Sequence, residues 1–178
     1  YESHDRNIFE IHGFSLGPNI KDEFNTRIKA GVDHFHDVSR MSDRDIVMFA
    51  RSLEIDIAVD LSGFTEGCRP GIFAMSAAST QVSYIGYPGT MGANYYDYLI
   101  SDKTIIPERN KKYYLENIVY LPSYQVNESI NYSQDISLNK KDLNIPEEAF
   151  VFCCFNDTYK ITPDIFNCWI QILKQVDN

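Results

Sequence analysis

The sequence predicts an α/β protein organised around a parallel sheet. Short apolar runs alternate with amphipathic helical segments along most of the chain. This alternation is typical of parallel sheets whose two faces are covered by helices. Two of the apolar runs, residues 55–61 and 81–85, are each followed by a glycine-rich loop. Folds of this class bind ligands in loops at the carboxyl ends of strands, although a tight connection without a ligand explains the same glycines equally well.

Composition bounds the class of protein. The chain has 178 residues, of which 44% are hydrophobic and 23% are charged, so it can form one globular domain or parts of two. The formal net charge of -9 argues against nucleic acid or an anionic membrane as a partner. No apolar run is long enough to span a bilayer. Four cysteines without a C-x-x-C spacing predict neither a zinc site nor a redox pair, and we expect a reduced, cytoplasmic protein.

The chain opens with a predicted strand and helix. Residues 7–14 alternate between apolar and polar side chains, which predicts a strand. Pro18 is expected to open a helix that Gly31 ends. An apolar side chain recurs at every fourth position of this helix and forms one stripe. These positions are Ile20, Phe24 and Ile28.

A histidine pair follows in the next predicted strand, residues 33–38. His34 and His36 are two residues apart, so they share one face of that strand. Two imidazoles on one face suit a metal ion, but no third ligand lies nearby in the sequence. We therefore favour solvated side chains at this position.

The next helix begins at Ser42, the predicted N-cap, with Asp45 at the capping-box position. Asp43, Arg44 and Asp45 also spell the Asp-x-Asp motif of metal-dependent glycosyltransferases. Acidic residues in a first helical turn stabilise the helix dipole, and this interpretation is preferred over a metal site. The expected buried stripe of this helix is Ile46, Phe49, Ala50 and Leu53.

Strands and loops then alternate up to residue 121. A polar loop at residues 62–71 precedes a short helix at 72–78, and the 81–85 strand precedes a loop at 86–92. Further strands are expected at residues 97–101 and 117–121. Because consecutive parallel strands end at the same edge of a sheet, both glycine loops should lie at one edge and face a common cleft.

The last third of the chain indicates a second domain. Hydrophobic content falls in a predicted linker, residues 126–145, which separates a domain at 1–125 from the start of another at 146–178. Residues 150–155 predict a strand. Thr162 and Pro163 then predict the N-cap and first position of a helix. Its expected buried face is Ile165, Phe166, Trp169, Ile172 and Leu173.

Three blocks of the sequence, in order, are similar to the motifs of one family. Residues 59–69 resemble its loop "[VD]-L-x-G-[YF]-T-x-x-x-R", residues 85–92 its loop "L-G-Y-P-G-T-x-G", and residues 154–163 its block "C-F-N-x-x-x-K-I-x-P". The chain therefore resembles the O-linked N-acetylglucosamine transferase/SPINDLY family of nucleotide-sugar glycosyltransferases. The resemblance extends from about Phe9 to Lys174.

This resemblance implies a GT-B fold, in which two Rossmann-like domains face each other across a cleft, usually behind tetratricopeptide repeats. It implies inverting, metal-independent transfer of a sugar from a nucleotide diphosphate to protein Ser/Thr hydroxyls, with no cofactor. The chain would supply the later part of the first domain and the start of the second. The family's histidine-containing loop would precede Tyr1 and further nucleotide-binding loops would follow Asn178, so we expect residues 1–178 alone to be inactive.

The resemblance assigns Lys160 as the catalytic cation that stabilises the leaving diphosphate. Its place between a predicted strand and a capped helix start suits that role, whereas the sequence alone also fits a solvated lysine. Arg69 is assigned to the acceptor peptide or cleft wall, and a structural ion pair is the alternative. The substrate-binding positions implied are Thr65, Gly67, Arg69, Ile85, Gly86 and Asp157.

Asp157 leaves the donor open. A family member that uses UDP-N-acetylglucosamine has glutamine at this position, and the SPINDLY branch has asparagine. A carboxylate beside a diphosphate would repel it, so Asp157 fits neither pattern. The expected donor is UDP-N-acetylglucosamine, and GDP-fucose is the alternative.

Two further classes remain as alternatives to the enzyme. A dehydrogenase-like dinucleotide binder would need a G-x-G-x-x-G fingerprint, which the chain lacks after its first strand. A non-catalytic peptide-binding module would not need a cation at position 160. The identity and role of Lys160 therefore separate the transferase from the module.

Overall fold

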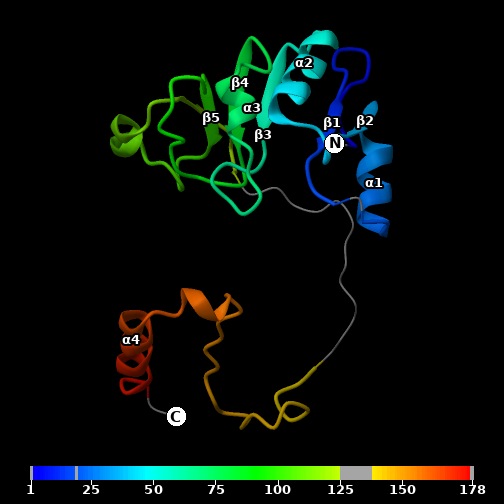
Figure 1. Cartoon of the computed structure of the whole chain (residues 1–178). Coiled ribbons are helices and arrows are strands. Elements are labelled where there is room, and N and C mark those ends of the chain that lie inside the picture. The colour runs from blue at the N-terminus through cyan, green and yellow to red at the C-terminus, as the bar shows by residue number, and fades with distance from the viewer. Residues whose placement is uncertain (1, 19, 125–137, 177–178) are drawn as a thin grey trace. The chain divides into compact units, whose positions relative to one another are not determined.

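The computed structural model describes residues 2–18, 20–124 and 138–176. The chain divides into two compact units, Tyr1–Asn127 and Glu128–Asn178, and each is considered by itself (Figure 1). The predicted linker falls largely outside the described residues, because positions 126–137 are not among them. The boundaries assigned to the two domains therefore stay a prediction. No helix in the described part of the chain is long and apolar enough to cross a membrane.

The first unit is an α/β structure in which every paired strand is parallel to its neighbour (Figure 1). Two strands form one sheet and four form another, in the orders β1-β2 and β3-β4-β5-β6. The predicted α/β class with parallel strands is confirmed. The strands are β1 (His12–Ser15), β2 (His34–Asp37), β3 (Ile57–Asp60), β4 (Thr80–Tyr84), β5 (Tyr98–Ser101) and β6 (Asn117–Tyr120).

A cleft of about 620 Å³ lies between β1 and β3, lined by residues of both strands. The sequence predicted a single sheet, whereas β1 pairs with β2 only and β3 pairs with β4 only. Among the described residues no strand pairs with the remaining edge of β1 or of β3. Ile57 and Val59, which share one face of β3, are also exposed, at 57% and 44%.

The first predicted strand is wrong in its first half. The strand begins at His12, and residues 6–8 form a turn, at the end of which the N–H groups of Ile8 and Phe9 donate to the carbonyl of Asp5 (3.0 and 2.9 Å). Ile8 and Phe9 are exposed. Alternation alone did not reveal that β2 is too short to pair with the earlier residues.

Helix α1 (Glu23–Gly31) begins later than Pro18, which corrects the expected start. Asp22 is its N-cap, because the Asp22 side chain accepts from the N–H of Asn25 (2.7 Å). An N-cap carboxylate satisfies an otherwise unpaired helical N–H, and Pro18 offers no such acceptor. The apolar stripe at Phe24 and Ile28 is half exposed.

Helix α2 (Asp43–Ser52) has the predicted cap. Ser42 accepts from the N–H of Asp45 (3.2 Å) and donates to its carboxylate (2.6 Å). Together with α3 (Gly71–Ala74), the helix contributes buried side chains to the core. The buried members of this core are Val38, Ile46, Val47, Ala50, Ile72, Phe73, Ala77, Met91 and Tyr96.

Gln81, at the second position of β4, is a buried polar side chain that the sequence did not single out. Its amide oxygen accepts from the N–H of Ala77 (2.9 Å), and its nitrogen donates to the carbonyls of Phe73 (2.8 Å) and Tyr95 (2.6 Å). One side chain thus ties the end of α3 and the segment before β5 to the central sheet.

We expect Gln81→Leu to lower the free energy of unfolding by about 3 kcal/mol. The change keeps the volume but leaves one buried N–H and two carbonyls unpaired, and each unpaired group costs about 1–3 kcal/mol. Urea melts of the two proteins measure the loss. Gln171→Leu on the exposed face of α4 is the control and should change stability by less than about 0.5 kcal/mol. Equal losses in both variants would contradict the role given to Gln81.

Asp102 follows β5 and accepts three backbone N–H groups. These belong to Ile105 (2.8 Å), Tyr124 (2.6 Å) and Thr104 (2.8 Å), and they hold the pKa of the Asp102 carboxyl below its usual value of 3.8. The unfolded chain therefore takes up this proton at higher pH than the folded protein. The stabilisation is complete above pH 3.8 and is lost as the pH falls through the folded pKa.

In urea melts taken between about pH 5 and pH 2, stability of the wild type should fall more steeply with acid than stability of Asp102→Asn. The amide cannot ionise, so its hydrogen bonds do not depend on pH in this range. Parallel slopes for the two proteins would show that the carboxylate of Asp102 contributes no acid-sensitive stability.

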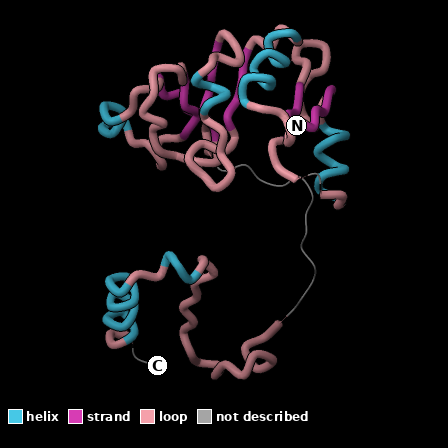
Figure 2. Tube along the Cα trace, in the orientation of Figure 1, coloured by secondary structure: helices cyan, strands magenta, loops and turns pink. Residues whose placement is uncertain are grey.

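The second unit contains a short 3-10 helix, η2 (Thr158–Lys160), and α4 (Pro163–Leu173). Thr162 is the N-cap and Pro163 the first residue of α4, as predicted, and the Thr162 hydroxyl accepts from the N–H of Ile165 (3.4 Å). The strand predicted at residues 150–155 is wrong, because this segment pairs with no other strand, and Figure 2 shows it as loop. A strand needs a ladder partner, and the described part of this unit has none.

The face of α4 that the sequence assigned to a core is also exposed in this unit. Ile165, Phe166, Ile172 and Leu173 have exposed fractions between 44% and 54%, and Trp169 is partly buried. The helical periodicity is correct, but no described element covers the stripe.

Candidate active site

The two glycine loops lie at one edge of one sheet, as predicted. Strands β3 and β4 are parallel neighbours with Asp60 opposite Ser83, and each loop leaves its strand at the carboxyl end. Gly86 lies against the backbone of the first loop: a Cβ on Gly86 would fall 2.7 Å from the Ser62 carbonyl oxygen and closer still to that of Leu61. The loops therefore form one contiguous surface.

Asp60, the last residue of β3, organises the first loop. One oxygen of its buried carboxylate accepts from the N–H groups of Ser62 (2.9 Å) and Gly63 (3.0 Å). The other accepts from the hydroxyl of Tyr96 (2.6 Å). Burial, together with the hydrogen bond to Asp60 and its charge, raises the pKa of Tyr96 and keeps this donor protonated. This role of Asp60 was not predicted from the sequence, although an aspartate between an apolar run and a Ser-Gly pair is the usual signal of such a turn.

Glu116 holds the second loop in the same way. Its side chain accepts from the Thr90 hydroxyl (2.7 Å) and from the N–H of Met91 (2.6 Å), and the residue is 4% exposed. A buried carboxylate that is fully hydrogen-bonded fixes the backbone it contacts. This residue was also missed, because Glu116 precedes β6 and is distant in sequence from the loop.

Ile85 is the most strained residue of the site. Its φ is +64°, and the N–H of Gly86 donates to the carbonyl of Tyr84 (2.9 Å), so Ile85 is the centre of a three-residue turn. A β-branched residue in this conformation is a true outlier, and turns of this kind are rare and strained. Strain of this type gathers where backbone must be held for a function, so it supports a role for the Ile85 and Gly86 backbone.

Thr65 and Gly67 lie at the exposed tip of the first loop. The Thr65 hydroxyl donates to the Ser62 carbonyl (3.0 Å), and Gly67 has a φ of +77° that glycine adopts without strain. Nothing lies within 4 Å of a Cβ placed on Gly67. Both residues are therefore accessible, and their predicted substrate contacts stay a prediction.

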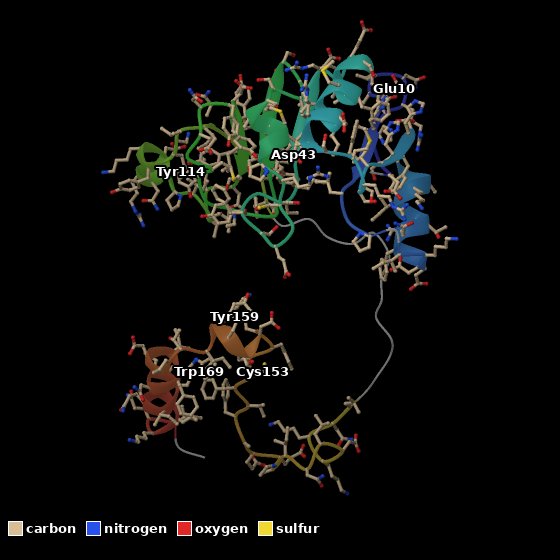
Figure 3. All side chains as sticks on the ribbon, in the orientation of Figure 1. Glu10, Asp43, Tyr114, Cys153, Tyr159 and Trp169 are labelled. Atoms are coloured by element: carbon tan, nitrogen blue, oxygen red, sulfur yellow. The ribbon has the colours of Figure 1, made fainter. Side chains whose placement is uncertain are left out.

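Arg69 forms a structural ion pair. Its Nε donates to the Asp43 carboxylate (2.7 Å), and a terminal nitrogen donates to the carbonyl of Met41 (2.8 Å). This is the alternative that the sequence left open for Arg69. It also gives Asp43, the first residue of α2 labelled in Figure 3, a partner other than a metal ion. A substrate contact by Arg69 stays a prediction, and it would have to coexist with this pair.

Asp157 and Lys160 belong to the second unit. The carbonyl of Asp157 accepts from the N–H of Lys160 (3.0 Å), which closes η2. The Lys160 ammonium is exposed and lies 5.8 Å from the ring centroid of Tyr159, which Figure 3 labels. Lys160 thus lies two residues before the N-cap of α4, where the helix dipole also favours a negative ligand.

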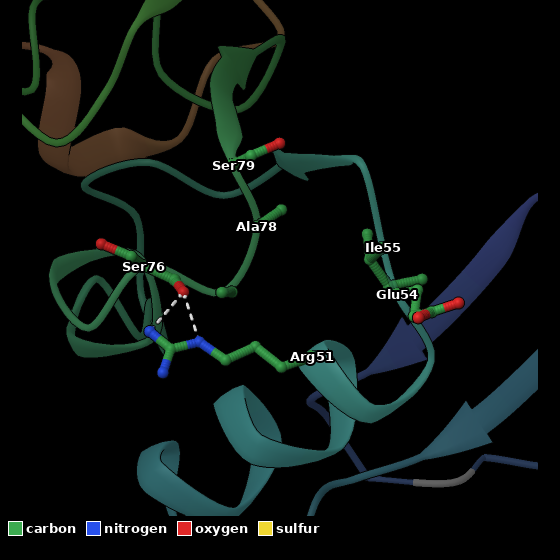
Figure 4. Close-up of a pocket in the computed structure, with 7 residues that line it drawn as sticks. Arg51, Glu54, Ile55, Ser76, Ala78 and Ser79 are labelled. Carbon is green, nitrogen blue, oxygen red and sulfur yellow. Dashed lines mark hydrogen bonds between the residues drawn. The ribbon is translucent and has the colours of Figure 1, made fainter.

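A separate pocket of about 400 Å³ lies at the other end of the sheet (Figure 4). It is lined by residues 76–79, which precede β4, and by the end of α2. The Arg51 guanidinium in this pocket donates to the carbonyls of Ser76 (2.8 Å) and Met75 (2.5 Å) and so closes the end of α3. These bonds make Arg51 a structural residue, and the pocket is not part of the candidate site.

The chain matches the family model described as "Glycosyl transferase family 41" over residues 1–128 and 125–178. It is 40% identical over 181 aligned residues to the Arabidopsis thaliana protein named "Probable UDP-N-acetylglucosamine--peptide N-acetylglucosaminyltransferase SEC", covering 98% of this chain and 18% of that protein. It is 32% identical over 150 aligned residues to a second Arabidopsis thaliana protein, named "Probable UDP-N-acetylglucosamine--peptide N-acetylglucosaminyltransferase SPINDLY". This alignment covers 84% of this chain and 16% of that protein.

The structure resembles a lysine-to-methionine mutant of the Thermobaculum terrenum O-GlcNAc transferase. The TM-score is 0.66 at 32% sequence identity, over 69% of this chain and 24% of that chain. This likeness confirms the expected GT-B glycosyltransferase fold. The chain spans less than a fifth of the length of the plant relatives. Because the two matches to the family model together cover the chain from residue 1 to residue 178, the chain belongs to glycosyl transferase family 41.

Proposed function

We propose that the full-length protein is a nucleotide-sugar-dependent protein O-glycosyltransferase that acts on Ser/Thr hydroxyls with inversion and without a metal in the transfer step. The observation that carries the proposal is the pair of contacting loops at the carboxyl edge of β3 and β4. Their backbone is fixed by two buried carboxylates, Asp60 and Glu116, and includes the strained residue Ile85.

In the proposed reaction the oxygen of the acceptor hydroxyl attacks the anomeric carbon of the sugar while the bond from that carbon to the diphosphate oxygen breaks. The hydroxyl proton is released, and the nucleoside diphosphate leaves with one more negative charge. Lys160 and the N-terminus of α4 would face this charge. The backbone of Ile85 and Gly86, with Thr65 and Gly67, would contact the sugar and phosphates.

UDP-N-acetylglucosamine is the proposed donor, in line with the names of the relatives. GDP-fucose is the second candidate. Asp157 motivates it, because this carboxylate matches neither the glutamine of the family member that uses UDP-N-acetylglucosamine nor the asparagine of the SPINDLY branch. The cytoplasm is the proposed location, because the four cysteines are free in the structure.

Donor competition separates the two candidates. Full-length protein is incubated with an acceptor peptide, labelled UDP-N-acetylglucosamine and an excess of unlabelled GDP-fucose, and then with the labels exchanged. We expect label on the peptide from UDP-N-acetylglucosamine only, with little inhibition by GDP-fucose. Label from GDP-fucose alone would reverse the assignment of the donor, and label from neither would contradict the proposed function.

A further inference from the structure

Three histidines and a glutamate meet at the start of the β1–β2 sheet. His12 and His34 are direct partners in the parallel ladder, and His36 is opposite Phe14, two residues further along. The three rings therefore share one face. The ring centroids of His12 and His34 are 4.5 Å apart, and those of His12 and His36 are 5.3 Å apart. Glu10, labelled in Figure 3, reaches the same place from the segment before β1.

Three ligand atoms converge in this cluster. The Glu10 carboxylate lies 2.7 Å from Nε2 of His34 and 3.5 Å from Nε2 of His12. The ligand atoms of all three residues lie within 4.8 Å of one another. This corrects the expectation that the His34 pair has no third ligand nearby. The missing ligands, Glu10 and His12, are 24 and 22 positions before His34 and approach it only through strand pairing.

His36, the fourth side chain of the cluster, sets the orientation of the His12 ring. Nδ1 of His12 lies 3.1 Å from Nε2 of His36. If Nδ1 of His12 carries the proton, it donates to His36, and Nε2 of His12 is left as a free acceptor on the side of Glu10. Metal-binding histidines typically donate their other ring N–H in this way, which fixes both the tautomer and the ring plane.

The spacing fits a small divalent transition metal. Bonds of about 2.0–2.1 Å at tetrahedral angles place neighbouring ligand atoms about 3.3 Å apart. The distances from the Glu10 carboxylate to Nε2 of His12 (3.5 Å) and to Nε2 of His34 (2.7 Å) lie on either side of this value. Two imidazoles and one carboxylate form a ligand set suited to Zn²⁺ and its neighbours rather than to Mg²⁺ or Ca²⁺, which prefer oxygen. Three protein ligands leave one position for water.

We propose that Glu10, His12 and His34 form a binding site for one divalent transition-metal ion, with zinc as the reference, and that His36 orients His12. The site links the segment before β1 to β2. Glu10 and His34 have exposed side chains, and Glu10 and His12 also line the cleft between β1 and β3, so an ion can enter from solvent. The ion takes no part in the sugar transfer proposed above.

The bound ion should also stabilise the fold. A two-stranded sheet has little stability of its own, and an ion that binds the folded arrangement of ligands more tightly than the unfolded chain shifts the equilibrium towards the folded state. Addition of Zn²⁺ should therefore raise the melting temperature of the wild type and leave that of a ligand-deficient variant unchanged.

The test is a titration of metal-free full-length protein with Zn²⁺ against a chromogenic chelator. We expect Glu10→Gln and His34→Ala each to lose one equivalent of tightly bound zinc, or to bind it about tenfold more weakly or worse. Glu10 is 67% exposed, so this variant tests the site even where a histidine change impairs folding. In crystals grown with Zn²⁺, anomalous scattering should locate the ion within bonding distance of the three residues.

His4→Asn is the matched control, because it removes the imidazole that lies outside the cluster. His4 bonds to Asp33 (2.8 Å), and we expect this variant to keep the wild-type zinc stoichiometry and affinity. Equal zinc binding by the wild type, Glu10→Gln and His34→Ala would overturn the proposal. So would competition for the site by millimolar Mg²⁺. The measurement does not use transfer activity, and its result is independent of the proposed reaction.

Discussion

Replacing Lys160 by alanine in the full-length protein is expected to lower the rate of sugar transfer by about a hundredfold or more. The lysine would face charge that develops on the diphosphate, so its contribution belongs mainly to the transition state. Donor binding should weaken only modestly. Folding should be nearly unchanged, because Lys160 is exposed and its side chain is not part of the apolar stripe of α4.

Single-turnover transfer by the wild type and the variant, together with thermal melts, measures both effects. Lys160→Arg should recover little, because a planar guanidinium does not replace a compact ammonium. Lys141→Ala, an exposed lysine of the same unit, is the matched control and should transfer at the wild-type rate. Near-normal turnover by Lys160→Ala would make Lys160 a surface residue and would contradict the catalytic role proposed for it.

Replacing Gly86 by alanine is expected to destabilise the first unit by about 3 kcal/mol. The new Cβ would overlap the Leu61 carbonyl oxygen and approach that of Ser62 to 2.7 Å. Both obstacles are backbone atoms held by the Asp60 turn, so neither can move without breaking that turn. The variant should also lose donor binding, because the two loops would separate.

Urea melts and donor titrations of the Gly86 variant test this expectation. Gly17→Ala is the control, because nothing lies within 4 Å of the added Cβ and the backbone of Gly17 is not in the left-handed region. It should change stability by less than about 0.5 kcal/mol. A Gly86→Ala protein with wild-type stability would show that the loops are not in close contact.

The sequence predicted those features that depend on neighbouring residues. The Ser42–Asp45 cap and the Thr162–Pro163 helix start are local patterns, and both appear as expected. The placement of the two glycine loops at one edge followed from the parallel strands that precede them. Each of these inferences needed only the chemistry of a few consecutive residues or the periodicity of one segment.

Features that depend on distant partners were not predictable in this way. Glu116 reaches Thr90 across 26 positions, and Asp43 pairs with Arg69 across the same separation. Neither pairing leaves a mark in the local sequence. The strand predicted at residues 150–155 has the expected composition but lacks a partner in its unit, and apolar composition cannot supply one. For the same reason the sequence named only His34 and His36 as possible metal ligands, whereas Glu10 and His12 approach His34 through strand pairing.

The proposed metal-independent transfer is tested by the intact mass of an acceptor peptide after incubation with the full-length protein and UDP-N-acetylglucosamine in the presence of EDTA. We expect a mass increase of one N-acetylglucosamine on a peptide that contains serine or threonine and none on the same peptide with alanine at those positions. With Lys160→Ala, the modified fraction should rise about a hundredfold more slowly. An unmodified serine peptide with both UDP-N-acetylglucosamine and GDP-fucose, from protein shown to be folded, would contradict the proposed transfer.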